Sequence, residues 1–298
     1  MTIQAVPYVI LLGFLFGSTL IASRFSVGQF QPTTYIGLRM LLASLGHVAF
    51  YAVSYRQRVW PKDRRLWRHA ALLGIFGTAV PMTSIVTSLQ YQSAGLTAVL
   101  LTTGPAITVL LAHFFLADES LTWRKSTGIA LALGGALLLT LRGESGLPDV
   151  SQASPLGYGL VFVAMVCSSS MSVYARRYMR DFDAFDVASI RMIAATLTVM
   201  PLSALLVGIN LDQVDGQGYF ALGYAALVGT FSGMLLAFYI IKRFGATPQS
   251  MSQYVIPVVA GLGGALFLGE RITGGMLAGM GLIIVGITLI NQRPRSQL

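Results

Sequence analysis

The chain contains one sequence pattern twice, with the second copy at an offset of 152 residues from the first. Identical residues recur at this offset, among them Arg39 and Arg191, Thr78 and Thr230, Met82 and Met234, and Pro105 and Pro257. The alignment needs no gap from about residue 9 to residue 116, and after one deleted residue Glu119 aligns with Glu270. A repeat of this length in an apolar chain is typical of transporters, because alternating access is often built from two related halves.

The composition predicts an integral membrane protein. Only 10% of the 298 residues are charged and 55% are hydrophobic, whereas a soluble domain carries roughly 25% charged residues. The basic residues behind the net charge of +9 lie at the ends of long apolar stretches, which indicates membrane topology and no nucleic-acid partner. The single cysteine, Cys167, excludes an internal disulfide, and we expect neither a metal site nor a cofactor. The first apolar stretch lacks a basic leader and an Ala-x-Ala pattern, so we interpret it as a retained helix.

Ten segments are long and apolar enough to cross a bilayer, which needs about 20 residues in a helix. We expect helices because lipid offers no partners to unpaired backbone groups. The predicted fold is therefore all-α, with ten transmembrane helices. The predicted spans are 5–23, 32–55, 69–89, 94–116, 122–141, 156–177, 184–208, 217–241, 246–268 and 273–291.

Five spans in each copy is an odd number, so the second copy enters the membrane from the opposite side. This predicts an inverted repeat with a first half at residues 1–145 and a second half at residues 150–298. Fifteen Lys and Arg residues fall on the side that holds both termini, and three fall on the other. This bias predicts that both termini are cytoplasmic.

The repeat also carries a family signature. The first copy has Ala94, Pro105, Leu116-Ala-Asp-Glu119, Leu121-Thr122 and Gly128, and the second has Ala246, Pro257, Leu268-Gly-Glu270, Ile272-Thr273 and Gly279. This doubled signature resembles the EamA-type branch of the drug/metabolite transporter superfamily. Within that branch the chain is most similar to the YddG group of bacterial amino-acid exporters.

The resemblance implies a central cavity lined by helices 1, 3, 4, 6, 8 and 9, with helices 5 and 10 at the periphery. It also implies export of small metabolites across the bacterial inner membrane, with a small molecule as substrate. A monomer is expected, although the small-residue pattern Gly275-x3-Gly279 also fits a homodimer.

Charged residues inside the predicted spans are few. Arg39 and Arg191 lie at equivalent depths, and two interpretations stay open for them. One is contact with a substrate carboxylate. The other, which we favour, is a scaffold role in which each arginine reaches toward headgroups or bonds the carbonyls at a neighbouring helix end. Glu119 and Glu270 follow helices and precede a Thr by three residues, so we interpret them as helix-start or loop-pairing residues rather than gates.

No Asp or Glu lies in the middle of any span. Proton-coupled carriers usually keep a buried carboxylate for this purpose, so we expect facilitated transport down the substrate gradient. His47 and His113 are the only deep titratable alternatives, and we interpret both as packing residues.

Polar and aromatic side chains on the spans suggest a cavity wall for a zwitterionic or neutral molecule with an apolar side chain. The alternative for each is helix packing, because Ser and Thr also hold helices together in lipid. Substrate choice is expected where the two copies differ, as at Ala79 and Phe231. The candidate residues are Thr78, Met82, Thr83, Thr102, Ser169, Tyr224, Phe231, Ser250, Gln253 and Tyr254.

Pro105 and Pro257 are equivalent prolines within spans, so each is either a gating hinge or a fixed kink. A sugar-nucleotide or phosphate-ester carrier is an alternative function, but such cargo usually needs Arg or Lys in the cavity. No span carries a catalytic motif, so an enzyme is not expected. A receptor or scaffold without flux is disfavoured because it does not need two interchangeable halves.

Overall fold

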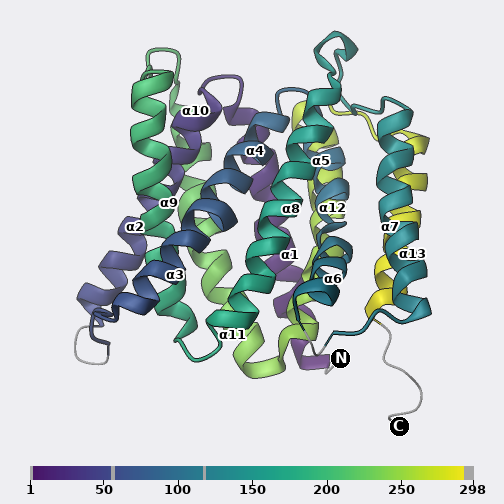
Figure 1. Cartoon of the computed structure of the whole chain (residues 1–298). Helices are drawn as coiled ribbons and strands as arrows, with labels where there is room; N and C mark the ends of the chain where they lie inside the picture. Colours follow the sequence, from purple (N-terminus) through teal and green to yellow (C-terminus); the bar gives the residue numbers. More distant parts are fainter. Residues whose placement is uncertain (1–2, 55–57, 117–118, 292–298) are drawn as a thin grey trace.

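The computed structural model describes residues 3–54, 58–116 and 119–291 (Figure 1). Within these ranges the chain is helical and has no strand. Residue 55, the predicted end of the second span, lies outside them. The helices run roughly side by side and form a single bundle, with connections at its two ends.

In the first half the helices match the predicted spans with two changes. The predicted helix 69–89 begins earlier and contains a π-helical segment, Ile75–Ala79. The predicted helix 94–116 is interrupted by a turn at Thr102–Thr103. The helices are α1 Val6–Ser26, α2 Pro32–Val53, α3 Arg64–Gly74, α4 Val80–Ser88, α5 Ala94–Leu101, α6 Gly104–Phe115 and α7 Trp123–Leu141.

The second half repeats this order. A π-helical segment, Tyr224–Ser232, joins α10 to α11, just as the segment Ile75–Ala79 joins α3 to α4. Unlike α5 and α6, helix α12 runs without a break through Pro257. The helices are α8 Pro155–Tyr178, α9 Ala184–Leu206, α10 Gly216–Gly223, α11 Gly233–Phe244, α12 Ala246–Leu268 and α13 Gly274–Asn291.

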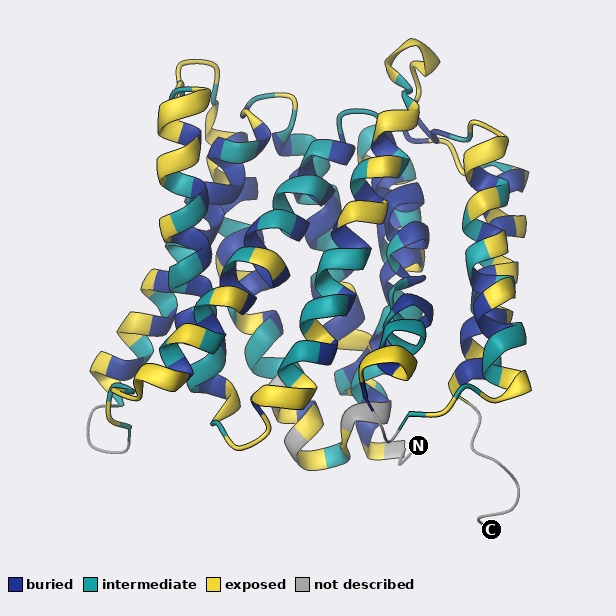
Figure 2. Cartoon of the chain, in the orientation of Figure 1, coloured by how far each residue is buried: buried dark blue, intermediate teal, exposed yellow. Residues whose placement is uncertain are grey.

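Nine helical segments in the described part are long and apolar enough to cross a membrane. Helix α7 does not belong to that set, because its first turn contains Arg124 and Lys125 and lowers its mean hydropathy. Figure 2 shows that many exposed residues lie on the outward sides and ends of the helices. Many of these side chains are large and apolar, for example Leu205 and Phe267, as expected for surfaces that face lipid.

Equivalent helices of the two halves pack against each other, α2 with α9, α5 with α12 and α7 with α13. Helices α2 and α9 meet where the Oγ of Ser44 lies 2.9 Å from Oγ1 of Thr196, its equivalent at an offset of 152. Helices α7 and α13 stand side by side at one edge of the bundle (Figure 1). There a Cβ on Gly128 would lie 2.6 Å from the carbonyl oxygen of Gly286, so the two backbones need glycine to approach this closely.

Candidate functional site

A cavity of about 290 Å³ lies near the middle of the helices that form the central part of the bundle. Helices α1, α2, α4, α5, α8, α9, α11 and α12 contribute to its wall, together with the two π-helical segments. Four pairs of identical, repeat-equivalent residues line it: Arg39 and Arg191, Met40 and Met192, Thr78 and Thr230, and Met82 and Met234. Both halves of the chain therefore supply the same residue types to one chamber.

Each arginine reaches across the chamber boundary to the threonine of the other half. Nε of Arg39 donates to Oγ1 of Thr230 at 2.9 Å, and Nη1 donates to the Oγ of Ser23 at 3.1 Å. Nε of Arg191 donates to Oγ1 of Thr78, and Nη2 donates to the carbonyl oxygen of Gly77 at 2.6 Å. We call these two contacts, Arg39 with Thr230 and Arg191 with Thr78, the arginine–threonine clamps.

The threonines of both clamps lie in the π-helical segments. Gly77 and Thr78 lie in the first segment and Thr230 lies in the second. A π-helical turn shifts the backbone hydrogen bonds by one residue and often marks a functional position. In the first segment the carbonyl oxygen of Gly77 accepts a hydrogen bond from Arg191, and Pro81, four residues further on, has no N–H to donate to it.

The expectation that these arginines reach headgroups or a helix end is wrong in its geometry. Arg39 is only 5% exposed, and Arg191 is half-buried against the π-helical segment. Both side chains instead bridge the two halves at the cavity wall. A scaffold or interface role and contact with substrate both stay predictions for these arginines.

Two of the ten predicted cavity residues, Thr78 and Met82, line this chamber. Thr83, next to Met82 on α4, does not line the chamber. Thr102 does not line it either, and its Oγ1 donates to the carbonyl oxygen of Val99. Ser169 donates to the carbonyl oxygen of Gly104, across the α6–α8 contact, while its neighbour Ser168 lines the chamber.

The remaining five lie outside the chamber wall. The hydroxyl of Tyr224 is 2.8 Å from the Oγ of Ser18, and the ring of Phe231 packs against His47. Ser250, Gln253 and Tyr254 are on α12 and do not contribute to the lining, which Ile256 joins from the same helix. The lining that sequence reasoning missed includes Phe16 and Leu20 of α1 and the residues Met40 and Met192, which directly follow the repeated arginines.

A second pair of repeat-equivalent contacts joins Arg24 to Glu270 and Arg176 to Glu119. Glu270 is 7% exposed and accepts from the backbone N–H of Ala94 at 2.9 Å and of Gly95 at 3.4 Å, with Nε of Arg24 3.7 Å away. The Glu270 carboxylate therefore caps the N-terminus of α5. Burial raises the pKa of the Glu270 carboxyl, although these N–H groups and Arg24 lower it in part.

Glu119, the equivalent of Glu270, makes a more exposed contact. It accepts from Nη1 of Arg176, the equivalent of Arg24, at 2.5 Å, and from Nζ of Lys125 at 3.1 Å. The hydrogen bond from Arg176 holds the pKa of the Glu119 carboxyl below its usual value. Glu270 thus lies at a helix start and Glu119 pairs with basic residues, and the roles of both glutamates stay predictions.

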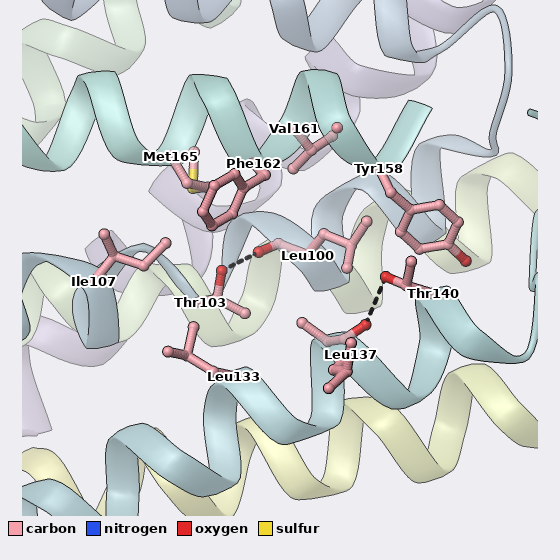
Figure 3. Close-up of a pocket in the computed structure, with 12 residues that line it drawn as sticks. Leu100, Thr103, Ile107, Leu133, Leu137, Thr140, Tyr158, Val161, Phe162 and Met165 are labelled. Carbon is pink, nitrogen blue, oxygen red and sulfur yellow. Dashed lines mark hydrogen bonds between the residues drawn. The ribbon is translucent and has the colours of Figure 1, made fainter. Parts of the chain in front are cut away.

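A larger cavity, of about 470 Å³, lies between α5, α6, α7 and α8 (Figure 3). Its wall is almost wholly apolar, and the hydroxyls of Thr103 and Thr140 are bonded to carbonyl oxygens of their own helical rods. Leu137 and Phe162 in its lining are 58% and 61% exposed, so the cavity opens toward the lipid side of the bundle. The central chamber, with its charged and polar groups from both halves, is the better candidate site. No group of His, Cys, Asp or Glu in the described ranges could hold a metal ion.

The family model of the EamA-like transporter family matches the chain twice, over residues 3–141 and 155–292. The chain belongs to the EamA-like transporter family. It is 24% identical over 277 residues to an uncharacterized transporter of Archaeoglobus fulgidus, covering 92% of this chain and 94% of that protein. It is 28% identical over 280 residues to the uncharacterized inner membrane transporter YedA of Escherichia coli K12, covering 93% and 87%.

A third relative is the S-adenosylmethionine/S-adenosylhomocysteine transporter of Chlamydia muridarum, 26% identical over 296 residues and covering 96% and 91%. One crystal structure superposes with a TM-score of 0.63 at 19% identity over 95% of each chain, which shows a shared fold. The chain is thus a multi-pass membrane transporter for a small molecule, and not an enzyme.

Proposed function

We propose that this transporter exports neutral amino acids, aromatic ones among them, and related small metabolites across the bacterial inner membrane. The observation that carries the proposal is the central chamber, lined by the same residue types from both halves. A single mid-depth site at the junction of two repeats is the arrangement that alternating access uses. The relationship to an inner membrane transporter of Escherichia coli supports the location.

We propose that the architecture is ten transmembrane helices in a 5+5 inverted repeat, with halves at residues 1–145 and 150–298. The contact of Ser44 with Thr196 and the glycine contact between α7 and α13 support it, because both join equivalent residues or helices. In this architecture α7 is the fifth span and lies beside α13, the tenth, at the periphery. The excess of basic residues on one side supports cytoplasmic termini.

We propose that Pro105 and Pro257 mark the hinges of the transport cycle. The two prolines are equivalent in sequence, but Pro105 follows the turn that separates α5 from α6, whereas Pro257 lies within the continuous helix α12. In an inverted repeat, equivalent segments exchange conformations when the site opens to the other side. The difference between the two segments supports their use as alternating hinges.

The walls of the chamber favour a substrate with an apolar side chain. Aromatic, aliphatic and thioether groups make up most of the lining, with Phe16, Met165 and Ile256 as examples. Thr19, Ser23 and Ser168 add hydroxyls that suit a small polar end. No Asp or Glu lines the chamber in the described ranges, which supports facilitated rather than proton-coupled export.

A phosphate-ester carrier is a second candidate, because Arg39 and Arg191 both line the chamber. Guanidinium groups bind phosphate well, so this observation weakens the main objection to phosphorylated cargo. The apolar character of the remaining wall and its modest volume favour amino acids. A receptor or scaffold without flux stays the least favoured alternative.

The decisive experiment is efflux from liposomes that contain the purified full-length protein and radiolabelled amino acids or sugar phosphates. We expect protein-dependent efflux of amino acids down their gradient, without any pH gradient. Thr78→Trp fills the chamber and should abolish efflux, and Met82→Trp should do the same while the Arg191 contact stays in place. Thr288→Trp, on an exposed face of α13, is the matched control and should retain efflux. Efflux equal to that of empty liposomes for every amino acid would refute the proposal.

A further inference from the structure

The central chamber contains two positive charges that the protein itself does not neutralise. Within the described ranges no carboxylate oxygen lies within 4 Å of either Arg39 or Arg191. Their hydrogen-bond partners are neutral hydroxyls and one carbonyl oxygen. A charge at this depth in a membrane is costly and is usually paired. Two arginines without a carboxylate partner in one cavity therefore indicate that the ligand carries an anionic group.

The two arginines are equivalent in sequence but not in accessibility. Arg39 is enclosed, and its guanidinium donates to Ser23 and Thr230. Arg191 is half-buried, and its Nη1 makes no hydrogen bond with any described residue. That atom is also not fully buried, and Arg191 lines the chamber. Arg191 thus has a donor free for a ligand in this conformation.

The surroundings of Arg191 restrict what the anion can be attached to. Met82, Met165, Met192 and Met234 supply thioether groups to the same wall, which fits an adaptable apolar contact. The volume of about 290 Å³ is at the low end of the range for small-molecule sites, about 300–1,000 Å³. The chamber therefore suits one small molecule with an anionic end and an apolar body.

We infer that Arg191 binds the carboxylate of the exported substrate in this conformation, through its free Nη1. This inference rests on the proposed transport function and specifies the substrate class as carboxylates with an apolar side chain. The hydrogen bonds to Thr78 and Gly77 hold Nε and Nη2 of the guanidinium and leave Nη1 for the ligand. Because the repeat is inverted, Arg39 takes the same role in the conformation open to the other side.

The test compares matched ligands in liposomes that contain the full-length protein. The ligands are phenylalanine, 3-phenylpropionate, phenylalanine amide and phenyl phosphate, measured as KM values for efflux. For the wild type we expect the KM of the two carboxylates to be about 10- to 100-fold below that of the amide, which is the scale of a charge-assisted hydrogen bond. Equal KM values for phenylalanine and its amide would refute the inference, and tighter selection of phenyl phosphate would replace the carboxylate with a phosphate ester.

Variants separate ligand binding from a scaffold role. Arg191→Gln should bring the ratio of amide to carboxylate KM close to one, and Arg191→Lys should restore part of that ratio. Thr78→Val removes only the partner of Nε and should weaken carboxylate selection less than Arg191→Gln does. Arg142→Gln, an exposed arginine at the end of α7, is the control and should leave the ratio unchanged. An Arg191→Gln protein that transports with the wild-type ratio would overturn the inference. If no ligand moves at all in the wild type, it is the proposed function that fails.

Discussion

Removing the side chain of Glu270 should destabilise this protein far more than removing that of its equivalent, Glu119. Glu270 is nearly inaccessible and accepts from the backbone N–H groups of Ala94 and Gly95 at the start of α5. Truncation to alanine leaves these two donors without an acceptor in a buried place. Each orphaned donor costs about 1–3 kcal/mol, so we expect Glu270→Ala to cost about 2–4 kcal/mol, with the 3.4 Å bond as the weaker of the two.

Glu270→Gln should cost clearly less, because the amide oxygen still accepts from Ala94. Glu119→Ala breaks only partly exposed contacts with Arg176 and Lys125, and such pairs are worth about 0–1 kcal/mol. The measurement is the midpoint of thermal unfolding of the detergent-solubilised protein, followed by tryptophan fluorescence. The reasoning is refuted if alanine and glutamine at position 270 have the same effect, or if Glu119→Ala is as destabilising as Glu270→Ala.

The pH dependence gives an independent check on the same residue. Burial raises the pKa of Glu270 in the folded protein above its ordinary value. A raised pKa means that the folded state favours the protonated carboxyl, so the stability from this group is greatest below the ordinary carboxyl pKa. It declines as the pH rises through the folded pKa. We expect this decline in the wild type and not in Glu270→Gln; an identical pH profile for both proteins would contradict the assignment.

Three further predictions follow from the packing and the charges. Gly135→Ala places a Cβ 2.9 Å from a backbone oxygen of α13 and should cost about 1–3 kcal/mol by overpacking, whereas Gly134→Ala, with nothing within 4 Å, should leave the unfolding midpoint unchanged or higher. Pro105→Ala and Pro257→Ala should leave substrate binding intact and slow efflux, and wild-type rates in both would remove the hinge proposal. The pKa of Glu119 is lowered by its basic partners, so its stabilising effect should be present above the ordinary carboxyl pKa and lost as the pH falls through the folded value; Glu119→Gln should lack this acid-range loss in a thermal unfolding series.

The positions of the helices followed from hydropathy, but their internal breaks did not. The predicted span 246–268 matches α12, while its equivalent is divided at Thr102–Thr103. The proline stands in both copies, but Thr102-Thr103-Gly104 precedes it in the first and Tyr254-Val255-Ile256 in the second. Glycine disfavours a continuous helix, so the local sequence contributes to the difference. The π-helical segments were equally invisible, because one extra residue in a helical turn leaves no mark on an apolar stretch.

The lining of the chamber was mostly missed for a related reason. Repeated residues were expected to serve the scaffold and differing residues the substrate, yet four identical pairs line the chamber, whereas Phe231 and Tyr224 contact other side chains outside it. Residues that are equivalent in an inverted repeat converge wherever the two halves meet, and the cavity lies at that junction. Met40 and Met192 directly follow the repeated arginines. The recurrence of the same dipeptide in the middle of two spans was therefore the signal that could have identified them.

The sequence by itself determined that this is a helical membrane transporter built from two related copies, because long low-charge segments and a repeat are properties of the chain alone. It did not determine which side of each helix faces lipid, a neighbour or the cavity. In a bilayer an apolar side chain is as suitable on the lipid side as on the packed side, so helical periodicity carries little information about direction. Only the tertiary structure decided this, by close glycine contacts and by hydrogen bonds between the halves. The tertiary structure shows that Arg39 and Arg191 both line one chamber and that each bonds a threonine of the other half.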